Sequence, residues 1–270
     1  MLAKIVFFIF LTCLSLSAWA DLLVSPTRIV FGERDRVKEV ILINTGNEKR
    51  SYRVEWSEKT VSTTGNYINL NDGLPEFALS PFVRFSPRQV TLQPGERQVV
   101  KLLVRKNNQM KMDEYRSHLR FFALPIERDP APEQRVDGIE LKLDVLTSYT
   151  IPVIYRTINP QPEINLEAVE VRQNSSASAD ILVTVSKQST TSITGSLFAY
   201  INDRETGKKV RIGELNSVTM FHESDQVTFR VKWQEFEKYN TYSGLLELEY
   251  VGSKEFTNIK FDQMAINLTL

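Results

Sequence analysis

Apolar and polar residues alternate along most of the chain, which is the pattern of β-strands that bury one face. The most regular example is the segment 139–145, where Ile139, Leu141, Leu143 and Val145 alternate with charged residues. No segment shows a comparable helical period. The pattern predicts strands at Val37–Ile43, Tyr52–Trp56, Gln98–Arg105 and Leu119–Leu124, and later at Ile164–Val171, Ala179–Val185, Gly195–Ile201, Lys209–Leu215, Gln226–Val231, Gly244–Val251 and Ile259–Leu270.

A break in this pattern divides the chain into two halves. Pro160 and Pro162 stand one residue apart just after Arg156, and closely spaced prolines favour an extended connector. About seven strands on each side, separated by turn residues, fit an immunoglobulin-like sandwich. We therefore expect an all-β protein of two immunoglobulin-like domains, residues 21–157 and 163–270, joined by a linker at 158–162.

Residues 1–20 have the composition of a secretory signal peptide. Lys4 precedes the apolar stretch Ile5–Leu16, and Ala18-Trp19-Ala20 has the small-x-small pattern of a cleavage site. An apolar run of about a dozen residues is shorter than the roughly 20 needed to span a bilayer. We expect export with cleavage after Ala20, which removes the only cysteine and with it any disulfide, and no later membrane insertion.

The composition argues against several classes of function. Lys and Arg number 33 and Asp and Glu number 33, so the chain lacks the excess of positive charge typical of nucleic-acid binding. The two histidines, His118 and His222, stand alone and offer neither a catalytic pair nor a metal-binding cluster. We therefore expect no enzyme activity, metal or cofactor, and we disfavour an exported β-sandwich hydrolase, which would need a pair of carboxylates in a cleft.

The alternating strand 139–145 has two interpretations. It can cover the core of its own domain, as most amphipathic strands do. Alternatively, its apolar face is offered to a partner, since each buried side chain of this kind contributes about 1.5 to 3 kcal/mol. The preceding loop contains Pro130 and Pro132, which discourage regular pairing with a neighbouring strand and favour the second interpretation.

Several motifs of the first half, taken in order, resemble those of PapD-like periplasmic chaperones of the chaperone–usher pathway. The residues of these motifs are more similar to those of the archaic branch of that family than to those of the classical branch. The second half is similar only in length and in its strand-rich character. The motifs are Leu22–Phe31 after the signal peptide, Ile43–Asn47, Arg84–Arg88, Leu92–Gly95, Glu114–Leu119 and Ile154–Arg156.

The resemblance implies a boomerang of two sandwich domains located in the periplasm. Such a chaperone binds pilus or fimbrial subunits that lack a strand, lends them one of its own, and delivers them to an outer-membrane usher. The donated side chains would be Ile139, Leu141, Leu143 and Val145. The alternative function is an exported immunoglobulin-like binding module or adhesin, in which the same face is satisfied internally.

The resemblance also implies residues between the two domains. In this family an Arg on the first strand and a Lys near the end of the donated strand's segment hold the C-terminal carboxylate of the subunit. Arg28 matches the Arg, because a guanidinium can bind a carboxylate with two hydrogen bonds. Pro152 stands where the Lys should be, so we assign the second anchor to Arg116, with a solvated surface arginine as the alternative and Arg120 as a weaker candidate.

Two further positions match residues that form an interdomain salt bridge in the family, Arg156 and Glu114. An acidic third partner in the second domain cannot be located from the sequence. Finally, a free chaperone with an apolar strand in solvent is prone to associate. We expect it to cap itself, as a dimer formed through strand 139–145.

Overall fold

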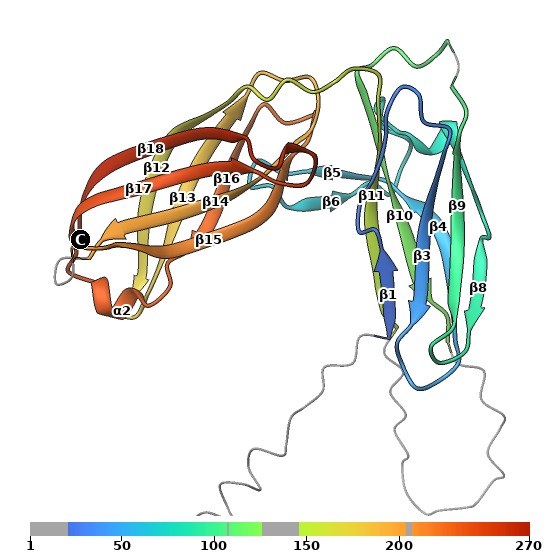
Figure 1. The fold of residues 1–270 in the computed structure, drawn as a ribbon, viewed down its shortest axis with the longest axis horizontal. Helices are drawn as coiled ribbons and strands as arrows, with labels where there is room; N and C mark the ends of the chain where they lie inside the picture. Colours follow the sequence, from blue (N-terminus) through green and yellow to red (C-terminus); the bar gives the residue numbers. More distant parts are fainter. Residues whose placement is uncertain (1–20, 107, 126–145, 204–206) are drawn as a thin grey trace, which may run out of the picture.

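The computed structural model describes residues 21–106, 108–125, 146–203 and 207–270, which form two β-sandwiches. Figure 1 shows the sandwiches as the two arms of an L, with the chain crossing once at the corner. The last strand of the first sandwich ends at Arg156 and the first strand of the second begins at Ile164. The expectation of an all-β protein with two sandwich domains is confirmed.

The first sandwich consists of two facing sheets. Pairing is antiparallel except between β2 and β11, which run parallel. One sheet has the order β1 (Leu22–Ser25), β3 (Val37–Asn44), β9 (Arg97–Val104) and β7 (Val83–Ser86), and the other has the order β2 (Ile29–Phe31), β11 (Ser148–Arg156), β10 (Glu114–Ala123), β4 (Arg50–Ser57) and β8 (Gln89–Leu92). Alternate residues of both sheets, among them Leu42, Val100, Leu119 and Phe121, fill the core between them.

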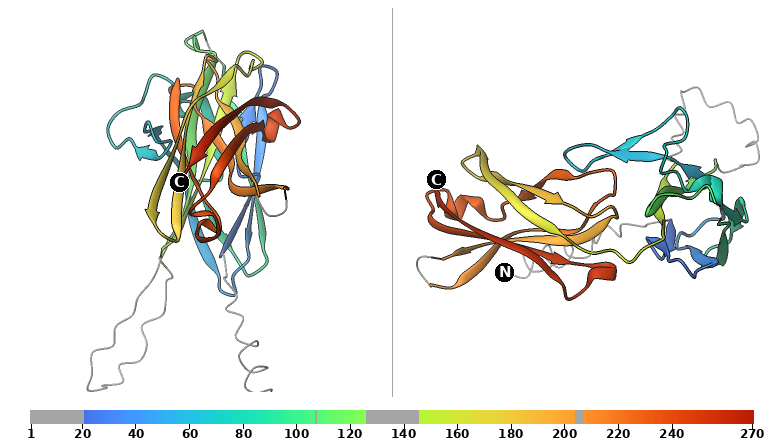
Figure 2. Two further views of the ribbon diagram at one scale, coloured as in Figure 1. Left: turned by 90° about the vertical axis from the view of Figure 1, so that its left-hand side faces the viewer. Right: turned by 90° about the horizontal axis from the view of Figure 1, so that it is seen from above.

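A hairpin leaves the first sandwich after β4 and extends toward the second domain, as Figure 2 shows from above. Its strands are β5 (Lys59–Val61) and β6 (Tyr67–Asn69), which pair only with each other. A single-turn 3₁₀ helix, η1 (Ser80–Phe82), follows before β7. We call residues 59–69 the β5–β6 hairpin.

The second sandwich packs a three-stranded sheet on a four-stranded one. In β13 every second side chain is buried, as the alternation in the sequence predicts. The first sheet has the order β12 (Ile164–Ser175), β13 (Ser178–Lys187) and β16 (Gln226–Lys232), and the second has the order β15 (Lys209–Met220), β14 (Ile193–Asn202), β17 (Ser243–Gly252) and β18 (Lys260–Thr269). A short helix, α2 (Phe236–Tyr239), and a 3₁₀ turn, η2 (Lys254–Phe256), complete the domain.

The sequence located most of these strands, but the apolar run Leu119–Leu124 marks only the second half of β10. This strand begins at Glu114 rather than at Leu119, because Glu114, Arg116 and His118 are buried against the second domain and do not follow the apolar alternation. The β5–β6 hairpin was not predicted, since β6 is exposed along its length. The predicted strand 139–145 lies outside the described residues, as does the signal peptide. Within the part of the chain that the structure describes, no helix is long and apolar enough to cross a membrane.

Candidate functional site

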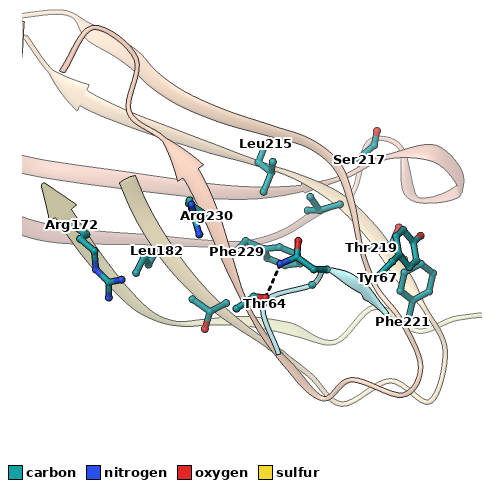
Figure 3. A pocket seen from close by; sticks show the side chains of 14 residues that line it. Thr64, Tyr67, Arg172, Leu182, Leu215, Ser217, Thr219, Phe221, Phe229 and Arg230 are labelled. Atoms are coloured by element: carbon teal, nitrogen blue, oxygen red, sulfur yellow. Dashed lines mark hydrogen bonds between the residues drawn. The ribbon is translucent and has the colours of Figure 1, made fainter. Parts of the chain in front are cut away.

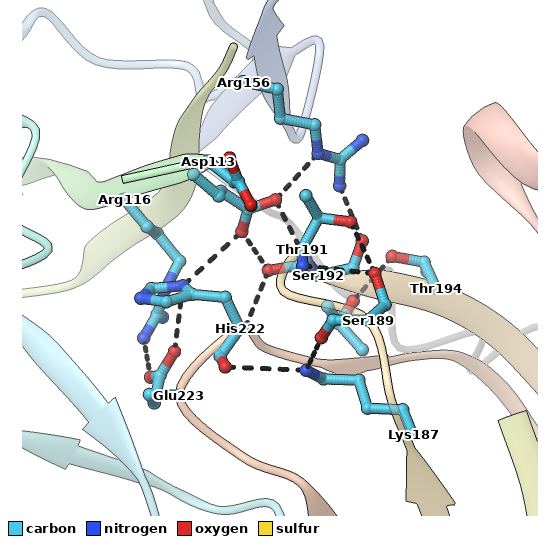
Figure 4. Close-up of polar contacts among 12 residues, drawn as sticks. Asp113, Arg116, Arg156, Lys187, Ser189, Thr191, Ser192, Thr194, His222 and Glu223 are labelled. Carbon is cyan, nitrogen blue, oxygen red and sulfur yellow. Dashed lines mark hydrogen bonds and ion pairs between the residues drawn. The ribbon is translucent and has the colours of Figure 1, made fainter. Parts of the chain in front are cut away.

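The corner between the two sandwiches gathers charged and polar side chains from both domains, shown in Figure 4. The first domain contributes residues from the ends of β10 and β11, where the two strands pair, and from the turn between β1 and β2. The second domain contributes residues from the start of β14, the loop after β15 and the turn η2. The acidic and basic side chains that approach one another in this interdomain cluster include Arg28, Glu114, Arg116 and Arg156 on one side and His222, Glu223 and Glu255 on the other.

Glu114 and Arg156 form a buried ion pair that also binds the second domain. The two residues are direct partners in the β10–β11 register, and Arg156 Nε donates to Glu114 Oε2 at 2.7 Å. Arg156 Nη2 donates to the carbonyl oxygen of Ser192 at 2.7 Å, while the Ser192 N–H donates to Glu114 Oε2 at 3.0 Å. The Ser192 hydroxyl donates to the other oxygen of Glu114. The pair therefore lies within the first domain and holds the first residues of β14 in the second.

The surroundings of Glu114 favour its ionised form. Burial alone would raise the pKa of this carboxyl, but contacts with His222, Arg156 and Ser192 outweigh it and lower the pKa to about 2. His222 Nδ1 lies 3.6 Å from Glu114 Oε1 and 3.3 Å from Glu223 Oε2. Glu114 is thus a fixed negative charge at physiological pH.

Arg28 reaches into the second domain from the turn between β1 and β2. Its Nη1 donates to Thr194 Oγ1 at 2.9 Å and to Thr219 Oγ1 at 3.2 Å, and its Nη2 donates to Glu255 Oε1 at 3.1 Å. The Nε–H is buried and meets no acceptor among the described residues. Burial lowers the pKa of the guanidinium from its usual range, an effect that Glu255 opposes. Arg28 is therefore held in place with one donor group unsatisfied.

Arg116 is fully buried, with 0% of its side chain exposed, and forms an ion pair with Glu223 of the second domain. Its guanidinium lies 3.9 Å from the ring centroid of Phe221 and 5.5 Å from that of Phe77. A further N–H donates to the carbonyl oxygen of Lys59, at the base of the β5–β6 hairpin, at 3.1 Å. Arg116 thus joins three parts of the molecule: β10, the hairpin and the loop after β15.

The β5–β6 hairpin itself bridges the domains. At its tip, the Thr228 N–H on β16, an edge strand of the second domain, donates to the Thr63 carbonyl oxygen at 3.0 Å. On β6, the Tyr67 ring packs edge-on against His118 at 5.0 Å and lies 5.7 Å from Phe221. Figure 3 shows Tyr67, Thr219 and Phe221 together at one end of a pocket of about 730 Å³, between the hairpin and the edges of β15 and β16.

The chemistry of the cluster is that of charge pairing. His118 is buried, and burial, together with the positive charges of Arg116 and Lys59, lowers its pKa to about 2, so its ring stays neutral. Among the residues described in the structure, no group of His, Cys, Asp and Glu side chains could hold a metal ion. What the cluster offers a ligand is a set of guanidinium groups whose present partners are carboxylates.

The structure brings the four sequence-predicted charged residues to this one corner. Arg116 lies opposite Ile154 on β11, and Pro152 lies opposite His118, so Arg116 is close to the junction end of the strand pair. Ile139, Leu141, Leu143 and Val145 lie outside the described residues. The sequence did not single out Glu223, Glu255, Ser192 or the hairpin, because each acts through a contact between distant parts of the chain and none belongs to a recognisable motif.

No protein-family model matches the chain, and no curated protein matches it in sequence. Solved structures do match its fold. The YadV chaperone superposes with a TM-score of 0.50 and 14% identity, over 92% of this chain and 100% of that one. The periplasmic chaperone SfaE gives 0.47 and 11% over 90% and 98%, and the SafB chaperone, solved with the SafA pilin of Salmonella enterica, gives 0.47 and 10% over 93% and 97%. At this level of identity the chain shares the two-domain fold of the YadV chaperone.

Proposed function

We propose that this chain is a periplasmic chaperone that binds pilus or fimbrial subunits, completes their fold with one of its own strands, and delivers them to an outer-membrane usher. The observation that carries the proposal is Arg28, an arginine in the corner between two sandwiches whose buried Nε–H meets no acceptor in the part of the chain that the structure describes. The fold shared with the YadV chaperone and the predicted signal peptide support the same role.

The strand that we propose to be donated is 139–145. A subunit that lacks a strand exposes an unpaired sheet edge and an apolar groove, which together promote aggregation. An added strand pairs with the edge through main-chain hydrogen bonds and fills the groove with alternate side chains. Ile139, Leu141, Leu143 and Val145 have the spacing that this requires.

The C-terminal carboxylate of the subunit would fix the register of the added strand. Arg28 is the more accessible anchor, because 10% of its side chain is exposed whereas Arg116 is fully buried. Arg116 can join it only by exchanging its ion pair with Glu223 for one with the ligand. We therefore assign first contact with the carboxylate to Arg28 and place Arg116 behind it.

This mechanism uses binding energy alone. The chaperone supplies the missing strand, and the strand of the next subunit displaces it at the usher, so neither ATP nor a catalytic group is needed. In the free chaperone an apolar face of 139–145 exposed to solvent would promote association. We therefore propose that two copies cover this face in a self-capping dimer formed through the segment. Sedimentation should show a dimer that Leu143→Glu converts to a monomer; a wild-type protein that stays monomeric at high concentration would contradict the dimer.

The function can be tested by co-purifying the tagged protein from the periplasm together with candidate subunits encoded near its gene. We expect a small β-rich subunit to accompany the wild type and to be lost with Arg28→Ala and with Leu143→Glu. The controls are Arg34→Ala, an exposed arginine of the first domain, and Lys142→Glu, which places the same new side chain on the opposite face of the predicted strand. Loss of the subunit with the controls as well, or with none of the variants, would favour the alternative of an exported binding module or adhesin.

A further inference from the structure

Glu255 covers the side of Arg28 that faces solvent. The other side of the guanidinium is held inside the second domain, where Nη1 donates to Thr194 and Thr219. The bond from Nη2 to Glu255 Oε1 lies at the surface, and 27% of the Glu255 side chain is exposed. A ligand that approaches Arg28 from solvent therefore meets Glu255 first.

The contact with Glu255 leaves Arg28 only partly satisfied. A single oxygen, Glu255 Oε1, accepts from Arg28 Nη2 at 3.1 Å and from Arg156 Nη1 at 2.9 Å. No acceptor among the described residues reaches the Arg28 Nε–H. Arginine binds a carboxylate most strongly when two of its N–H groups meet the two oxygens. A second carboxylate can therefore give Arg28 what Glu255 does not, an acceptor for Nε–H beside one for Nη2.

Glu255 can leave Arg28 without losing all its partners. Its bond to Arg156 remains, so the exchange does not create an unpaired buried charge, which would be costly. Arg28 likewise keeps Thr194 and Thr219. The exchange replaces the ion pair between Arg28 and Glu255 by one between Arg28 and the ligand carboxylate. Arg28 and Arg156 each have a carboxylate partner both before and after the exchange.

We propose that Glu255 is an intramolecular competitor for the carboxylate-binding site at Arg28. Its carboxylate holds the site in the free protein and yields it when the C-terminal carboxylate of a subunit binds. The inference rests on the proposed function of Arg28 as anchor. Because Arg156 also holds Glu114 and Ser192, exchange at Arg28 changes a bond of the same cluster that joins the domains. Glu255 thereby sets the affinity of the anchor and couples its occupancy to the domain junction.

The competing account is that Glu255 is only a structural lock between the domains. In that case removing its charge loosens the junction and weakens any ligand at Arg28, whereas an intramolecular competitor, once neutralised, frees the site and strengthens binding. The two accounts therefore predict opposite changes in affinity.

The test is calorimetric titration with a short synthetic peptide of alternating valine and serine, prepared with a free C-terminal carboxylate and as the C-terminal amide. We expect wild type to prefer the acid, and Glu255→Gln to bind the acid about fivefold more tightly, the equivalent of one modest ion pair, with no change for the amide. Glu255→Asp keeps the charge on a shorter side chain and should fall between the two. Glu39→Gln removes an exposed charge from the first domain and should match wild type.

The outcomes separate the competitor from the anchor. If wild type prefers the acid but Glu255→Gln binds it equally or more weakly, the competitor role is wrong and the anchor stands. If wild type binds the acid and the amide equally, the role of Arg28 as carboxylate anchor is wrong. The role of Glu255 as competitor, which rests on it, is then wrong as well. Thermal unfolding of each variant shows whether a loss of binding reflects a loss of folding.

Discussion

Glu114 and Arg156 face each other across β10 and β11 of the first domain, and both bind the backbone of Ser192 in the second. An ion pair within the first domain thus forms hydrogen bonds with a residue of the second domain. The alignment of the two strands sets the position of the pair, and the pair in turn sets where β14 begins. Glu255 of the second domain contacts both Arg156 and Arg28, and so adds a further ion pair between the domains.

Glu114→Gln should lower the free energy of unfolding of the protein. The substitution preserves the shape of the side chain but removes a buried charge that Arg156 and Ser192 satisfy, and breaking such a pair typically costs about 3 to 5 kcal/mol. We expect a lower urea midpoint and separate transitions for the two domains. The control is Glu39→Gln, whose partner is Lys101 and whose side chain is 52% exposed, so that it should cost less than about 1 kcal/mol. Equal midpoints for the two variants would contradict the role of the junction.

The same carboxylate should make stability depend on acidic pH. The pKa of Glu114 in the folded protein, about 2, lies below its ordinary value of 4.5. A lowered pKa stabilises the folded state fully above the unfolded value, and this contribution is lost as pH falls from 4.5 toward 2. Urea midpoints of wild type and Glu114→Gln should therefore differ most near neutral pH and converge in this window. A difference that stays constant through it would show that the charge of Glu114 contributes nothing.

His118 should produce a second pH dependence at milder acidity. Its pKa in the folded protein is about 2 against an ordinary value of 6.5, so the unfolded chain takes up a proton below pH 6.5 that the folded chain refuses. The contribution of His118 to the free energy of unfolding is therefore fully present above pH 6.5. It falls by about 1.36 kcal/mol for each pH unit below 6.5. His118→Asn should flatten this slope in urea unfolding measured from neutral pH down to 4.5, whatever its effect on the absolute stability. An unchanged slope would mean that the ring is protonated in the folded state.

The fold was largely predictable from the sequence because most strands bury one face in their own sandwich. The alternation in β13 and β9 is of this kind, and it places both strands within a few residues of their observed ends. The apolar pattern did not mark the first half of β10, because the partners of its side chains include polar groups of the other domain. Resemblance to a family brought Arg28, Glu114, Arg116 and Arg156 together, but Glu223 and Glu255 depend on packing between domains, which no local pattern encodes.

Two glycines with similar backbone conformations can be compared, Gly65 at the tip of the hairpin and Gly73 in the loop that follows the hairpin. Gly65 and Gly73 have φ of +76° and +75°, so alanine is strained at both by about 1 to 2 kcal/mol. At Gly65 a Cβ would also lie 3.2 Å from the Phe229 ring, whereas at Gly73 it would meet nothing within 4 Å. Gly65→Ala should therefore destabilise the protein by about 1 kcal/mol more than Gly73→Ala in urea unfolding. Small-angle scattering should show the domains splaying apart only in Gly65→Ala.

Equal effects of the two alanine substitutions on stability and scattering would contradict the packing of the hairpin on the second domain. A larger effect at Gly73 would contradict it too, since only the Cβ added at Gly65 would meet the side chains of Phe229 and Val227.

The central claim is that segment 139–145 fills the groove of a subunit with alternate side chains. A photo-crosslinking amino acid can be placed at each position of the segment in turn and activated in the co-purified complex. We predict crosslinks to the interior of the subunit from positions 139, 141, 143 and 145, and none from 140, 142 and 144, because successive residues of a strand face opposite sides. Crosslinks without this two-residue period, or crosslinks confined to the first domain of this protein itself, would contradict strand donation.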